Sequence, residues 1–193
     1  ILLCILFIYT FTFFSYPDFS KLMFKVFLVV SLPFYFLKYK RDFMFILLLV
    51  AILLQILTWG TAVLSQSVLV DELPKIDRLA KLFSFIFIAF WIKGDERVVK
   101  TTLFLFLTGF LFGVFNSSDF IADYNYIIQE GISRRVDFGI KNSQYLSMIS
   151  GVAMLITLLF LFNVTMHWKI LFVFFFIVLM SLFIFSESRQ SWL

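Results

Sequence analysis

Residues 43–59 read FMFILLLVAILLQILTW, without a single charged side chain. An α-helix needs about 20 predominantly apolar residues to cross the hydrocarbon core of a bilayer. Other apolar runs lie on both sides of this one, and none has the apolar–polar alternation of a barrel strand. We therefore expect an all-α fold, a polytopic bundle of about seven transmembrane helices, with spans near 1–16, 22–37, 43–59, 79–92, 98–115, 145–163 and 170–185.

The composition excludes most other classes of protein. The chain is 62% hydrophobic and only 15% charged, whereas a soluble domain is about 25% charged. A soluble enzyme, a nucleic-acid-binding protein and a disordered tail are therefore excluded. The single cysteine, Cys4, lies in an apolar run, so we expect neither a disulfide nor a metal cluster. With 30 Phe and 7 Gly, aromatic packing should replace most small-residue contacts between helices.

Three features leave alternatives open. The fourth run has a short apolar core, 82–92, which fits a tilted or a re-entrant segment as well as a span. The loop 60–81 mixes apolar and charged residues, as either an interfacial segment or a solvated connector would. Gly109 and Gly113 form a GxxxG pair, which is either a close helix contact or a chance spacing.

Basic residues indicate the orientation of the spans. Lys and Arg are concentrated in three short turns between spans. Most acidic residues lie in the longer segments that connect the other spans. The positive-inside rule places the basic turns in the cytoplasm. We therefore expect one transmembrane domain over 1–193, with cytoplasmic turns at 38–42, 93–97 and 164–169 and outward loops at 60–81 and 116–144.

The outward loop 116–144 is the most polar part of the chain. Ser118 is placed to cap a short surface helix that ends at Gly131. Beyond it, two arginines and a lysine form a candidate anion-binding site, because one guanidinium group can donate hydrogen bonds to two phosphate oxygens at once. Anchoring to lipid head groups would also explain these cations, although it does not require their polar neighbours. The group comprises Arg134, Arg135, Asp137, Gly139, Lys141 and Asn142.

A second polar cluster, SESRQSWL, occupies residues 186–193. The sixth span runs inward and the seventh returns outward, so Arg189 should emerge on the same side as Arg135. Two arginines far apart in the sequence would then lie close together in space. This convergence predicts a site for a polyanionic ligand at the outer boundary of the membrane.

These two stretches resemble a known family. Residues 135–146 read RVDFGIKNSQYL, and residues 188–193 read SRQSWL after one helical hairpin. This ordered pair of motifs is similar to that of the O-antigen ligase and O-antigen polymerase superfamily. The resemblance covers about residues 130–193; the preceding part of the chain agrees with the family only in being built of hydrophobic helices.

The resemblance implies a GT-C-type glycosyltransferase in the bacterial inner membrane, with its active site facing the periplasm. Its partners would be an undecaprenyl-diphosphate-linked glycan as donor, a lipid A-core or growing glycan as acceptor, and membrane lipids, but no nucleic acid. It would need neither a metal nor another cofactor. Ligase and polymerase activities remain equally open. A transporter or flippase that binds the same lipid-linked anion without chemistry is the main alternative, and a structural membrane subunit is a third.

The resemblance also assigns roles to residues. Arg135 and Arg189 match arginines that engage the donor diphosphate, where positive charge stabilises the leaving group. Asp137 would orient Arg135. The family also uses a histidine in a later outward loop; the one histidine here, His167, lies in an expected cytoplasmic turn, so we expect this chain to be part of a longer enzyme. The remaining expected substrate-binding residues are Arg134, Gly139, Lys141, Asn142, Gln144, Ser188 and Trp192.

Overall fold

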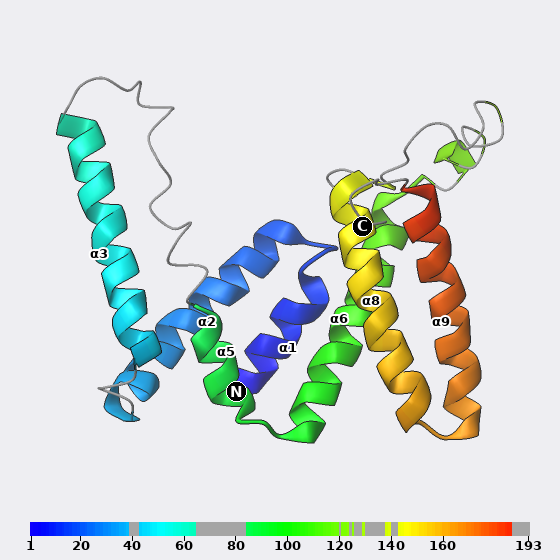
Figure 1. Cartoon of the computed structure of the whole chain (residues 1–193), viewed down its shortest axis with the longest axis horizontal. Coiled ribbons are helices and arrows are strands. Elements are labelled where there is room, and N and C mark those ends of the chain that lie inside the picture. Colours follow the sequence, from blue (N-terminus) through cyan, green and yellow to red (C-terminus); the bar gives the residue numbers. More distant parts are fainter. Residues whose placement is uncertain are drawn as a thin grey trace. The chain divides into compact units, whose positions relative to one another are not determined.

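A computed structural model describes most of the chain, and every element of secondary structure in its described residues is a helix (Figure 1). The expectation of an all-α fold is therefore confirmed. The described residues are 1–38, 43–64, 84–119, 121–123, 125, 129, 138–139 and 143–186.

Five described helices are long and apolar enough to cross a membrane, which identifies a multi-pass membrane protein. They contain 20 to 22 residues, or about 30 Å of helix at 1.5 Å per residue. The expected count of about seven spans is not confirmed. The five are α2 (Pro17–Lys38), α3 (Phe43–Leu64), α6 (Glu96–Ser117), α8 (Ser143–Asn163) and α9 (Met166–Phe185).

The other two apolar runs contain shorter helices. Helix α1 (Leu2–Thr12) has 11 residues and α5 (Phe85–Ile92) has 8, which gives about 16 and 12 Å. Pro17 begins a new helix directly after the first run, because proline suits the first turn of a helix and cannot continue one. Helix α5 ends where Lys93 and Gly94 adopt the left-handed conformation, with φ of 52° and 73°.

The chain divides into two compact units. Unit 1 contains residues 1–6 and 22–99, and unit 2 contains residues 7–21 and 100–193. Unit 1 includes α3, α5 and most of α2, and unit 2 includes α6, α8, α9 and the second half of α1.

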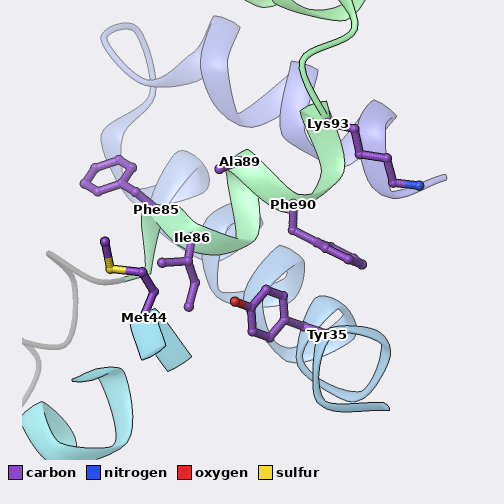
Figure 2. Close-up of a pocket in the computed structure, with 7 residues that line it drawn as sticks. All are labelled: Tyr35, Met44, Phe85, Ile86, Ala89, Phe90 and Lys93. Carbon is purple, nitrogen blue, oxygen red and sulfur yellow. The ribbon is translucent and has the colours of Figure 1, made fainter. Parts of the chain in front are cut away.

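In unit 1, an aromatic cluster joins α2, α3 and α5. The ring of buried Tyr35 lies 5.4 Å from that of Phe45, 5.2 Å from that of Phe87 and 5.3 Å from that of Phe90. Tyr35 and Phe90 also line an open apolar groove (Figure 2). The indole Nε1 of Trp91 also donates a 3.0 Å hydrogen bond to Oγ of Ser31, which is fully buried. Edge-to-face rings add attraction beyond surface burial, so this cluster fixes α5 against the end of α2.

In unit 2, α8 and α9 form an antiparallel hairpin (Figure 1). Only residues 164 and 165 separate the two helices, because Met166 already belongs to α9. The rings of Phe160 and Phe172 stack across the hairpin at 5.1 Å, and Phe104 of α6 meets both edge-on at 6.3 and 6.4 Å. The aromatic packing expected from the high Phe content therefore holds α6 against the hairpin.

Gly109 and Gly113 make a close contact within unit 2. A Cβ atom at Gly109 would collide with the backbone carbonyl of Phe11, and one at Gly113 would lie 2.6 Å from Cβ of Phe14. The Phe14 ring packs edge-on against Phe110 of α6, with centroids 5.0 Å apart. Of the two interpretations of the GxxxG pair, the structure supports the close helix contact.

Candidate functional site

The chain segments that flank both predicted motifs meet at one end of unit 2. Helix α6 ends there at Ser117, α8 begins there at Ser143, and α9 returns there at Phe185 (Figure 1). We call this end the loop end, because residues 118–142 and 187–193 leave from it. The hairpin of α8 and α9 creates the convergence, since its second helix brings the chain back to the face from which the first departed.

Phe138 and Gly139 fasten the polar loop to the loop end. Phe138 is buried in the core cluster that contains Val114 and Leu146, and its φ is 48°. Gly139 follows with φ of 72°, and a Cβ there would collide with the carbonyl oxygen of Ser117. A residue other than glycine would be strained here both by its backbone and by this contact. The structure thus gives the motif glycine a positioning role.

Gln144 of the first motif and Ser186, which precedes the second motif by two residues, also stand at the loop end. Gln144 lies in the first turn of α8 with an exposed side chain, so it is available to a ligand. Ser186, the first residue of the second polar cluster, is fully buried at the end of α9, and its Oγ donates a 2.8 Å hydrogen bond to the carbonyl of Phe183. The second polar cluster therefore begins inside the packed wall of unit 2.

The other predicted site residues lie outside the described residues, so their placement stays a prediction. The structure gives only the positions of the helices on either side of them. The residues of the first motif lie in the chain between α6 and α8, and those of the second motif follow α9. They are Arg134, Arg135, Asp137, Lys141, Asn142, Ser188, Arg189 and Trp192.

The predicted cap of the short helix after α6 is wrong by one residue. Ser118 turns back, and its Oγ donates a 2.7 Å hydrogen bond to the carbonyl of Val114. The acceptor at the new helical turn is Asp119, whose Oδ1 receives the backbone N–H of Ala122 at 3.3 Å. Both side chains are good N-caps, but the serine hydroxyl is used to close the last turn of α6.

Buried hydroxyl groups below the loop end were missed by the sequence reasoning. Ser147, Ser150 and Thr157 of α8 are fully buried. The Oγ of Ser150 donates to the carbonyl of Leu146, and Oγ1 of Thr157 donates to that of Ala153, each at 2.7 Å. Their helical spacing within an apolar run was the available signal. These bonds give the hydroxyl groups the hydrogen-bond partners that lipid cannot provide.

His167 lies away from the loop end. It occupies the first turn of α9, is exposed, and is separated from Ser186 by nearly the whole of the 20-residue helix, or about 30 Å. It therefore has no part in a site at the loop end of unit 2.

No protein-family model, curated protein or solved structure matches this chain. The resemblance to the O-antigen ligase and polymerase superfamily consequently rests on the two motifs alone.

Proposed function

We propose that the protein is a membrane glycosyltransferase of the O-antigen ligase or polymerase type. It transfers a glycan from an undecaprenyl-diphosphate donor to a lipid A-core or glycan acceptor on the periplasmic face of the inner membrane. The observation that carries the proposal is the convergence at the loop end, where one hairpin brings Ser186, two residues before the SRQSWL motif, back to the end that holds Gly139 and Gln144.

The proposed chemistry needs positive charge at the leaving group. As the bond between the sugar and the diphosphate breaks, negative charge develops on the diphosphate oxygens. Arg135 and Arg189 hold those oxygens through paired N–H donors and stabilise that charge, as preorganised donors do in other transfer reactions. Asp137 holds the Arg135 guanidinium in position. Gly139 keeps the loop at the membrane surface through its close approach to Ser117.

The transporter alternative finds less support in helices α3, α6 and α8. Transporters of anions usually carry ionisable groups near the middle of the membrane and broken helices around the binding site. Helices α3 and α8 contain no charged residue, and the charged residues of α6 lie within its first five positions. The cations at the loop end therefore favour binding at the surface over passage through the bundle.

Conservative substitution of the arginines tests the proposal. Glycan transfer from the lipid-diphosphate donor is measured in membranes with matched levels of wild-type protein, Arg135→Lys, Arg189→Lys and Arg134→Lys. The first two variants should lose about 100- to 1000-fold in rate, by analogy with the loss of one transition-state donor. Arg134→Lys is the matched control and should be milder, since a point charge suffices for head-group anchoring.

Two results would reject the proposal. Near-normal transfer by Arg135→Lys would show that Arg135 does not make a paired contact with the diphosphate. Movement of the lipid-linked glycan across the membrane by the wild-type protein, with no transfer to any acceptor, would establish the transporter alternative.

A further inference from the structure

Phe138 combines two features that rarely occur together. Its side chain is 6% exposed and packs in the core cluster of unit 2, while its backbone has φ of 48°. The left-handed conformation disfavours every residue with a Cβ, and bulky residues are outliers there. Lys93 is the one other non-glycine residue with positive φ in the described part of the chain, and its side chain is exposed. Phe138 is thus a buried ring that the packing holds on a strained backbone.

The ring and the backbone of Phe138 favour opposite outcomes. Glycine or asparagine would adopt this backbone more easily, but either would leave the space of the ring unfilled. Burial of the ring offsets the cost of the left-handed conformation. Strained residues persist only where the surrounding structure over-determines them, and they cluster at functional sites. The strain at Phe138 therefore indicates a role for this ring beyond that of an ordinary turn residue.

The turn at Phe138 and Gly139 limits the reach of two predicted site residues. Arg135 precedes Phe138 by three residues, and Asn142 follows Gly139 by three. An extended chain spans at most about 3.6 Å per residue, so each of these Cα atoms lies within about 11 Å of the turn. Burial of Phe138 and the close approach of Gly139 to the Ser117 carbonyl fix the turn itself at the loop end. Whatever holds the turn therefore also limits the position of Arg135.

We propose that Phe138 is a positioning residue for the diphosphate site, an inference that rests on the proposed function. Its buried ring acts through three residues of backbone and holds the Arg135 guanidinium where charge develops on the leaving diphosphate. Phe138 lies in the core and does not touch the substrate. A displacement of about 1 Å can cost about 100-fold in rate. Loss of the ring should therefore reduce transfer, although no group that binds the donor is removed.

Transfer kinetics of variants at Phe138 test the proposal. The full chain is assayed in membranes at matched amounts of folded protein, with Phe160→Ala as the matched control. Phe160 belongs to the same core cluster and is 7% exposed, but it lies 17 residues along α8 from Ser143, or about 26 Å from the loop end. Its removal creates a similar loss of packing far from the proposed site.

Phe138→Ala and Phe138→Gly should each lower kcat about 100-fold. KM should change little, because the charge that Arg135 stabilises develops only in the transition state. Phe138→Leu keeps an apolar side chain in the core and should restore most of the rate. Phe160→Ala should leave kcat unchanged. Normal kcat in Phe138→Ala, or an equal loss of kcat in Phe160→Ala, would overturn the proposal.

A double-mutant cycle tests whether Phe138 acts through Arg135. In the Arg135→Lys background, Phe138→Ala should cost much less in kcat than it does in the wild type, because the contact that it supports is already lost. Full additivity of the two substitutions would show that Phe138 acts on transfer by another route, and it would overturn the positioning role.

A spin label at position 135 distinguishes failure of this proposal from failure of the proposed function. With Cys4 replaced, Arg135→Cys is labelled and the mobility of the label is measured by electron paramagnetic resonance, which requires no glycan transfer. Phe138→Ala should mobilise the label, and Phe160→Ala should not. Equal mobility in both variants would overturn the positioning role even if the wild type transfers glycan. A mobilised label in Phe138→Ala, with no transfer by the wild type, would reject the proposed function while the hold of Phe138 on position 135 would stand.

Discussion

Replacement of Gly139 by alanine should loosen the loop end of unit 2. A side chain at φ of 72° costs about 1–2 kcal/mol in the left-handed conformation. The new Cβ would also lie within 2.8 Å of the Ser117 carbonyl carbon, and such overpacking costs typically about 1–3 kcal/mol. Gly139→Ala should therefore destabilise this contact by about 2–5 kcal/mol in total.

Gly94→Ala is the matched control, because Gly94 has φ of 73° but no atom lies within 4 Å of its added Cβ. It should show only the backbone penalty. Hydrogen exchange of peptides covering 110–118 and 143–150 reports local opening of the loop end. Exchange there should be about 30- to 4,000-fold faster in Gly139→Ala, since each 1.4 kcal/mol is about a factor of ten, and unchanged in Gly94→Ala. Unchanged exchange in Gly139→Ala would refute the close approach to Ser117.

Three further predictions concern other parts of the chain. Asp119→Ala should destabilise the helical turn after α6 by about 1 kcal/mol, measured by hydrogen exchange at that turn. Ser118→Ala should leave the cap of that turn intact, because the Ser118 hydroxyl bonds to α6 instead. Trp91→Phe should lower the stability of unit 1 by about 1–3 kcal/mol in thermal unfolding, because it leaves a buried hydroxyl of α2 unpaired; an unchanged midpoint would contradict the role of that bond. With Cys4 replaced, Ser118→Cys but not Lys40→Cys should react with an impermeant thiol reagent in intact cells, and the reverse pattern would invert the topology.

Hydropathy predicts where helices lie better than whether they span. The run at 43–59 lies within α3 and the run at 170–185 within α9, because apolar composition alone determines burial in lipid. The first and fourth runs contain helices of only 11 and 8 residues. The end of α5 depends on a local stop signal, the left-handed Lys93–Gly94 pair, which a hydropathy window does not detect.

The candidate site was predictable to a smaller extent. The return of α9 to the loop end follows from one short turn and was expected from the order of the spans. The role of Gly139 was not, because it depends on contact with Ser117, which lies 22 positions earlier in the chain. The cap was missed for a similar reason: both Ser118 and Asp119 suit it, and the geometry at the end of α6 decides between them.

The central claim is that the loop end binds a lipid-linked diphosphate through two arginines. The most direct measurement is photo-cross-linking of an undecaprenyl-diphosphate probe to the protein in membranes, with the labelled residues mapped by mass spectrometry. Labels should fall within 116–144 and 186–193, and labelling should drop about tenfold or more in Arg135→Lys and Arg189→Lys but much less in Arg134→Lys. Labelling elsewhere in the chain, or equal labelling of all four proteins, would contradict the claim.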